Sequence, residues 1–236
     1  MSLRHKKQVG SLETGLAADW NDNHITDFTD ETEDNLMRIG SAISGEWDTA
    51  QTAGGSAPVW ALVGAAGSGH AWVTLNTGAA TGQSSSMRLK MGGSAGDTTS
   101  PDDLPIFSAA VNVEAVHTAG IVAEWGFFGS ATAIFTANQA GAYFRIEDNQ
   151  LYAVCGDGAA EDAELIGDFN EYGNYKIVIN SANVAFYVDN MKTAVVTIAA
   201  NRPAVNLTPK ISVISANNVD STLNVDGVAL VRLRKK

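Results

Sequence analysis

The 236 residues include 26 Asp and Glu against 15 Lys and Arg, which gives a formal net charge of -11. Apolar residues make up 45% of the chain, enough to build a core, so a wholly disordered protein is excluded. A single cysteine, Cys155, excludes an internal disulfide framework and a cysteine-rich zinc site. No apolar run approaches the roughly 18 residues of a membrane span, so we expect no membrane insertion.

Charge is unevenly distributed along the chain. Seven of the 15 basic residues lie in residues 1–7 and 232–236, which contain no acid. The stretch 8–231 therefore combines 8 basic with 26 acidic residues, a formal charge of -18. A body this acidic repels phosphate, so we expect no nucleic-acid partner. The basic ends are interpreted either as solvated tails or as contacts with an acidic neighbour. No apolar stretch follows the basic start, so we expect no secretory signal.

Residues 1–45 differ from the rest of the chain in the spacing of their apolar residues and in their content of acids. Between Leu16 and Ile43, apolar residues recur mostly at spacings of three to five, and seven acids lie within 19–34. This pattern predicts one or two short helices, at 17–24 and 30–43, within a helical or extended arm. The segment is too short and polar for a core of its own. We expect it to dock on its own domain, a sister subunit or a larger assembly.

From Glu46 onward the sequence has the alternating apolar pattern that is typical of β strands. Alternating apolar residues in 142–147 and 150–154, joined by Asp148-Asn149, predict a hairpin, and a second hairpin is expected across 175–179 and 184–188. Further strands are expected at 72–76, 86–91, 106–116, 120–128, 193–198, 210–215 and 224–232. The sequence therefore predicts an all-β, two-sheet antiparallel jelly-roll sandwich over 46–236, preceded by the arm. Residues 92–105 and 155–168 are expected to be long loops, where binding sites commonly lie.

The stretch 142–231 resembles the concanavalin A-like jelly roll of the laminarinase and LamG type. The resemblance rests on the hairpin 142–154, on 172–179, on 184–190 and on 223–231. In that family an aromatic-Tyr-Val-Asp-Gly phrase forms a hairpin turn. Here the phrase ends in Asn190, which also tolerates a left-handed turn. The resemblance implies the fold but says little about function.

Residues 15–25 are similar to the Ala-x-Asp-Trp-Asn-x-x-His segment near the N-termini of tailed-phage structural proteins. This resemblance implies a non-enzymatic virion protein, either a tail fibre-type protein or a capsid decoration or spike, located at the particle surface. Its jelly roll would be exposed and would contact host-surface glycans. Its arm would bind other virion proteins and form a trimer. The arm residues expected to make this attachment are Trp20, Asn21, His24, Ile25 and Phe28.

Catalytic signatures are missing from the sequence. A retaining glycosidase needs two carboxylates about 5–5.5 Å apart. Laminarinase-type enzymes place them on one strand as Glu-x-Asp-x-(x)-Glu, a run that this sequence lacks. It also lacks a Gly-x-Ser-x-Gly elbow, and its four histidines are scattered without metal-ligand spacing. We therefore expect a protein without enzymatic activity that requires no cofactor.

Two binding sites are predicted on loops. The expected loop 155–168 gathers four carboxylates suited to structural Ca²⁺, with a solvated acidic loop as the alternative. These are Asp157, Glu161, Asp162 and Glu164. The aromatic residues nearest to expected loops are the candidates for stacking on a glycan, namely Trp47, Trp60 and Tyr172. A stand-alone carbohydrate-binding jelly roll is therefore the alternative to a virion protein.

Overall fold

The computed structural model describes residues 24–27, 38–39, 42–43, 47–51, 59–62, 71–89, 99–114, 120–129, 135–169, 172–189, 191, 193–216 and 218–231. Its strands are β1 (His24–Asp27), β2 (Arg38–Ile39), β3 (Ala42–Ile43), β4 (Trp47–Gln51), β5 (Val59–Leu62), β6 (Ala71–Asn76), β7 (Ser84–Leu89), β8 (Ile106–Glu114), β9 (Ile121–Phe128), β10 (Gly141–Glu147), β11 (Gln150–Gly156), β12 (Glu161–Asp168), β13 (Tyr172–Ile179), β14 (Val184–Val188), β15 (Val196–Ile198), β16 (Thr208–Ile214) and β17 (Thr222–Val231). Helical structure in this part of the chain is one 3₁₀ turn, η2 (Pro101–Asp103). No helix there is long and apolar enough to span a bilayer.

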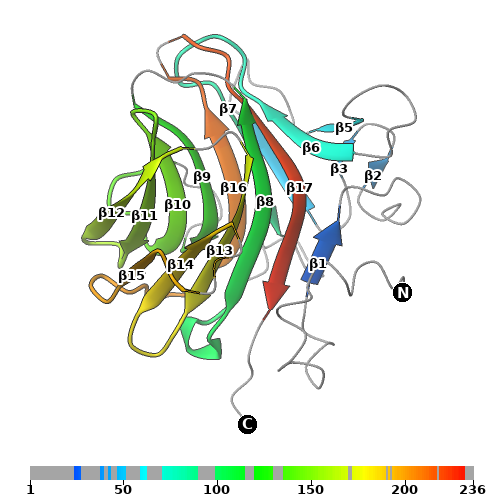
Figure 1. The fold of residues 1–236 in the computed structure, drawn as a ribbon. Helices are drawn as coiled ribbons and strands as arrows, with labels where there is room; N and C mark the ends of the chain where they lie inside the picture. Colours follow the sequence, from blue (N-terminus) through cyan, green and yellow to red (C-terminus); the bar gives the residue numbers. More distant parts are fainter. Residues whose placement is uncertain are drawn as a thin grey trace.

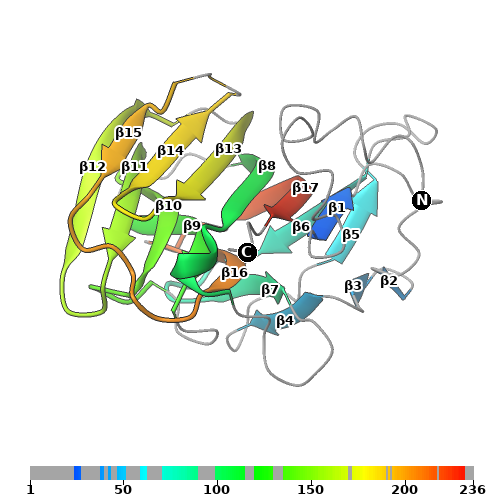
Figure 2. The ribbon, with the colours of Figure 1, turned by 90° about the horizontal axis from the view of Figure 1, so that it is seen from below.

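Two antiparallel sheets lie one on the other, as seen from below in Figure 2. The ten-stranded sheet runs in the order β15-β14-β13-β8-β17-β6-β5-β3-β2, with β1 paired to β17. The seven-stranded sheet runs β12-β11-β10-β9-β16-β7-β4. Strands distant in sequence are neighbours in both sheets, as for β8, β17 and β6 in Figure 1. The predicted two-sheet jelly roll is confirmed.

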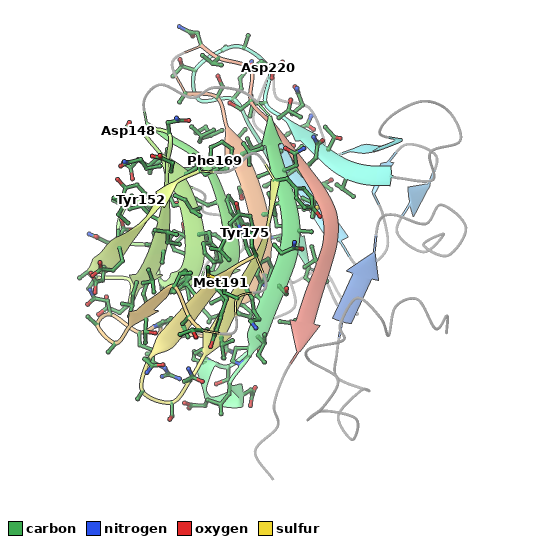
Figure 3. All side chains as sticks on the ribbon, in the orientation of Figure 1. Asp148, Tyr152, Phe169, Tyr175, Met191 and Asp220 are labelled. Atoms are coloured by element: carbon green, nitrogen blue, oxygen red, sulfur yellow. The ribbon has the colours of Figure 1, made fainter. Side chains whose placement is uncertain are left out.

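The core lies between the sheets because successive strand residues point to opposite faces. Trp125 of β9 packs on Phe144 of β10 and Tyr175 of β13, with ring centroids 5.9 and 4.8 Å apart. All three side chains are at most 1% exposed. Figure 3 shows Tyr175 between the two layers and Tyr152 at the outer side of the seven-stranded sheet. Alternate residues of the same strands are therefore left for the outer faces.

The hairpin predicted at Asp148-Asn149 is confirmed. Both residues adopt positive φ, 50° and 63°, as a tight turn that matches the twist of β10 and β11 requires. The second predicted hairpin is also present, with β13 and β14 paired from Tyr175↔Val188 to Ile179↔Val184.

The prediction of a long loop at 155–168 is wrong. Only a short turn separates β11 from β12, and β12 pairs with β11 from Gly156↔Glu161 to Gln150↔Asp168. Five acids and three glycines made this segment resemble a loop, since these residues are depleted in strands. Pairing with β11 outweighs that weak preference.

The helices predicted in the arm are also not found at the described positions. His24–Asp27 is strand β1, while Arg38–Ile39 and Ala42–Ile43 form strands β2 and β3. Strand β6 pairs with β17 at 222–225, and β1 pairs with it at 227–230. β1 therefore extends the ten-stranded sheet beyond the end of β6. The division into an arm and a sandwich at residue 45 stays a prediction.

Candidate functional site

A group of charged side chains lies on the outer face of the seven-stranded sheet, the face away from the core. In β10, Phe144 and Ile146 face the core, so Tyr143 and Arg145 face outward. The strand register places Glu124 of β9 directly opposite Arg145. We call Glu124, Tyr143, Arg145, Glu161 and Lys210 the outer-face network.

Arg145 is the centre of this network. Its Nε donates to Glu124 Oε1 at 2.9 Å, and its Nη1 donates to Glu161 Oε1 at 2.6 Å. Its Nη2 donates to Glu161 Oε2 at 3.2 Å and to the Tyr143 hydroxyl at 3.1 Å. Glu147 adds a more distant, half-exposed carboxylate 3.8 Å from Nη1. Every guanidinium nitrogen is thus engaged, which fixes the plane of the side chain.

Glu124 is the buried anion of the network, only 1% exposed. Burial raises the pKa of its carboxyl, and the charge and hydrogen bond of Arg145 oppose that rise. Its second oxygen, Oε2, accepts a hydrogen bond from the Phe135 backbone N–H at 3.3 Å. Burial by itself lowers the pKa of the Arg145 guanidinium. The hydrogen bond to Glu161 and the charge of Glu124 outweigh that effect, so the pKa is raised above its usual value. The arrangement therefore keeps a full positive charge between two carboxylates.

Lys210 of β16 is the second buried cation. It is 1% exposed, and its Nζ lies 4.3 Å from the centroid of the Phe128 ring. Burial lowers the pKa of this ammonium group to about 8, although the charge of Glu124 acts in the opposite direction. An aromatic ring face stabilises a desolvated cation. Lys210 thus links the charged groups to an aromatic neighbour.

Aromatic side chains form a small apolar cluster on the same outer face. The rings of Phe128 and Tyr143 stack with centroids 4.7 Å apart, and Val154 packs with them. Tyr152 of β11 lies at the margin of this cluster and is partly exposed. Its hydroxyl donates to Gln150 Oε1 at 3.1 Å. The accessible part of this face thus combines an aromatic ring with polar groups of fixed orientation.

The segment 135–140 covers part of this face. The Gly129 N–H donates to the Ala140 carbonyl at 2.7 Å, and the Phe135 N–H donates to Oε2 of Glu124. The Gln139 carbonyl lies so close to Gly156 that no Cβ would fit there. Glycine at this position therefore allows the covering segment to lie directly on β11. The buried part of the network is closed, while Glu161 and Tyr152 remain partly accessible.

The four carboxylates predicted to bind Ca²⁺ do not converge. Asp157 closes the turn before β12, where its Oδ1 accepts from the Ala159 and Ala160 N–H groups at 2.8 Å. Glu161 instead binds Arg145. Asp162 and Glu164 lie one and three positions further along β12, so they project from the opposite side of the strand to Glu161. No group of three or more metal-ligating side chains is found in the described residues. This residue set does not fit one shared calcium ion.

The predicted glycan-contacting aromatics are separated in the structure. Tyr172 begins β13 in the ten-stranded sheet and is 46% exposed. Trp47 lies in β4 and Trp60 in β5, where the structure describes only their backbone. Of the predicted arm residues, His24 and Ile25 pair with β17 through their backbone. Trp20, Asn21 and Phe28 lie outside the described part of the chain.

Sequence reasoning missed most of the outer-face network. The partners are far apart along the chain, with Arg145 standing 21 residues after Glu124 and 16 before Glu161. A usable signal was present, because Glu124, Arg145 and Lys210 each interrupt an apolar strand near its middle. A charge in the middle of a strand needs a partner when it is buried.

Comparison with solved structures places this fold among lectin and glucanase domains. The exoplasmic/lumenal domain of VIP36 in its Ca²⁺/Man3GlcNAc-bound form superposes with a TM-score of 0.56 at 12% identity, covering 81% of this chain and 86% of that chain. The Emp47p carbohydrate recognition domain gives 0.56 at 10% identity, with 84% and 92% covered. A beta-1,3-glucanase from Mycobacterium marinum gives 0.53 at 12% identity, with 88% and 97% covered.

These likenesses show that the chain has a concanavalin A-like jelly-roll fold. No protein-family model matches the chain, and no curated protein matches its sequence. The comparisons give no support to a virion role, which stays a prediction from the sequence.

Proposed function

We propose that this protein is a carbohydrate-binding jelly-roll module that uses the outer face of the seven-stranded sheet. The observation that carries the proposal is the partly exposed ring of Tyr152, which stands opposite Arg145 across the β10–β11 pair, on the face where Arg145 fixes the carboxylate of Glu161. An aromatic ring supplies apolar area at a low cost in conformational entropy, and oriented oxygens accept hydrogen bonds from sugar hydroxyls. The comparisons support the same class of ligand, because VIP36 and Emp47p are named for bound sugars or for carbohydrate recognition.

The ligand is a neutral glycan. The accessible polar groups at this margin are the carboxylates of Glu161 and Glu147 and the amide of Gln150. The stretch 8–231 carries a formal charge of -18. Sulfated or uronic-acid glycans would be repelled by both features, whereas a neutral glycan can donate its hydroxyl protons to the carboxylates.

The module binds its glycan without cleaving it. A retaining glycosidase needs one carboxylate that attacks and a second that gives a proton to the leaving oxygen. Here Glu124 and Glu161 both bind Arg145, and Glu124 is also held by the Phe135 N–H under the covering segment. Substrate would have to displace Arg145 from both carboxylates. This geometry favours a structural network that supports a binding surface.

Affinity electrophoresis in native gels containing laminarin or yeast mannan tests the proposal. The full chain should be retarded by one of these neutral polysaccharides. Tyr152→Ala should weaken binding about tenfold, as loss of a central aromatic contact commonly does. Met191→Ala is the matched control, because Met191 is 54% exposed in the turn after β14, far from the network. Equal retardation of Tyr152→Ala and wild type would contradict the proposed surface, and release of reducing sugar would contradict binding without hydrolysis.

A further inference from the structure

A row of uncharged polar side chains crosses the outer face of the ten-stranded sheet. Tyr172 of β13 stands opposite Asn112 of β8, which stands opposite Asn224 of β17, which in turn stands opposite Thr74 of β6. Neighbours along the strands, such as Val111 and Val113 on β8, are buried in the core, so this row faces outward. Four adjacent strands span about 14 Å at the usual strand spacing.

One end of this row is accessible and the other is fixed. Tyr172 is 46% exposed, and Asn112 and Thr74 are partly exposed. Asn224 is 5% exposed, and its Oδ1 accepts a hydrogen bond from the Thr74 hydroxyl at 2.8 Å. The inner pair is therefore a rigid support, and Tyr172 with Asn112 forms the reachable end.

Asn112 carries an unsatisfied acceptor. Its Oδ1 is covered and receives no hydrogen bond within the described part of the chain. Most covered polar atoms in native structures do have a partner. The terminal torsion of an Asn side chain is soft, so the amide can turn its oxygen toward a donor on a bound molecule. A sugar hydroxyl on the Tyr172 ring would be such a donor.

No charged side chain belongs to this row. The nearest cation on β13 is Lys176, whose Nζ lies over the Tyr187 ring at 4.3 Å from its centroid. The carboxylate of Asp189, at the end of the β13–β14 pair, is held in place because its Oδ1 accepts from the Asn174 N–H at 3.2 Å. A ring followed by amide and hydroxyl groups matches the hydroxyls and apolar faces of uncharged sugars.

We infer that the Tyr172–Asn112 end of this row is a second glycan-contacting surface, on the sheet opposite to the outer-face network and specific for neutral oligosaccharides. The inference rests on the proposed function for its ligand class, but it uses different residues on a different sheet. One molecule would then hold two separate oligosaccharides, or two segments of one long polysaccharide. Two linked contacts raise the apparent affinity for a polymer well above that for a short oligomer.

Isothermal titration calorimetry of the full chain with laminarihexaose, and in parallel with mannohexaose, tests this inference. We expect two molecules of one oligosaccharide to bind per chain. Tyr172→Ala should reduce the stoichiometry to one, and Tyr172→Phe should keep it at two because the ring remains. Asn112→Ala should weaken the second site about tenfold. Met191→Ala should leave the outer-face site unchanged.

The outcomes separate the inference from the proposal on which it rests. If Tyr172→Ala binds with wild-type stoichiometry and affinity while Tyr152→Ala loses binding, the second surface does not exist and the proposed function stands. If the wild-type chain binds neither hexasaccharide, both are overturned. Circular dichroism of each variant checks the fold, which the exposed position of Tyr172 should leave intact.

Discussion

Arg145 determines how charge is accommodated on the outer face of the seven-stranded sheet. Its guanidinium neutralises one buried and one partly exposed carboxylate, and it also holds the Tyr143 hydroxyl. Buried ion pairs often add little net stability compared with apolar residues of the same shape. Their loss is costly because a charge is then left without a partner. The network is therefore expected to fix the shape of the binding face more than to raise the stability of the fold.

Arg145→Met should destabilise the protein by about 3–5 kcal/mol, because it leaves Glu124 buried without its cation. Adding Glu124→Gln in the same chain should recover part of that loss. Urea unfolding of the wild type, both single variants and the double variant measures the coupling energy. Additive effects of the two substitutions would show that the ion pair does not act as a unit.

Lys210 should make stability depend on pH above neutrality. Burial lowers its pKa from 10.5 to about 8 in the folded state. Between these two values the unfolded chain binds more protons than the folded one, so stability rises as pH increases through that window. Below about pH 8 the full cost of burying the charge is present. From pH 8 to 10, wild type should gain up to about 3 kcal/mol relative to Lys210→Met. Denaturant unfolding at several pH values measures this difference, and parallel pH profiles for the two proteins would contradict it.

Strand β1 shows that part of the predicted N-terminal arm belongs to the ten-stranded sheet. It pairs with β17 from His24↔Leu230 to Asp27↔Gly227, where β6 no longer reaches. Residues expected to form an attachment arm thus also complete a sheet. Removal of β1 would leave that part of β17 without this partner, and exposed strand edges favour aggregation.

Deletion of residues 1–30, which removes β1 but keeps β2 and β3, should lower the melting temperature, whereas deletion of residues 1–20 should not. Loss of the β1 ladder should cost about 2 kcal/mol, which for a domain of this size corresponds to roughly 4–8 °C. Differential scanning calorimetry of the two truncated chains compares them directly. Equal melting temperatures would mean that β1 does not stabilise the sandwich.

Local patterns were sufficient to predict the hairpins and the class of fold. Alternation in β10 and β11 with Asp148-Asn149 between them leaves few alternatives to an antiparallel pair. Strand β12 could not be found this way, because its residues have low strand preference and its stability comes from β11 and from the ion pair of Glu161. A site assembled across several strands depends on the register in which those strands pair. For strands far apart in the sequence, that register cannot be predicted from the sequence of either strand alone.

At the scale of the whole molecule, the sandwich presents two outer faces of different chemistry. The seven-stranded sheet bears a charged network with Tyr152 at its margin, and the ten-stranded sheet bears the neutral row that ends at Tyr172. The stretch 8–231, which forms both faces, carries a formal charge of -18. Under the proposed function, this combination should favour neutral glycans over anionic ones. Trimer formation and attachment to a virus particle stay predictions from the N-terminal motif.

The most direct test of carbohydrate binding at the outer face is a titration of the ¹⁵N-labelled full chain with laminarihexaose or mannohexaose, followed by amide chemical shifts. Binding at this face should shift amides of β10, β11 and β12 around Tyr152 and Glu161, together with those of 135–140. A separate set near Tyr172 is expected if the second surface also binds. Spectra that stay unchanged with both sugars, or shifts that spare β10 to β12 altogether, would contradict the proposed site.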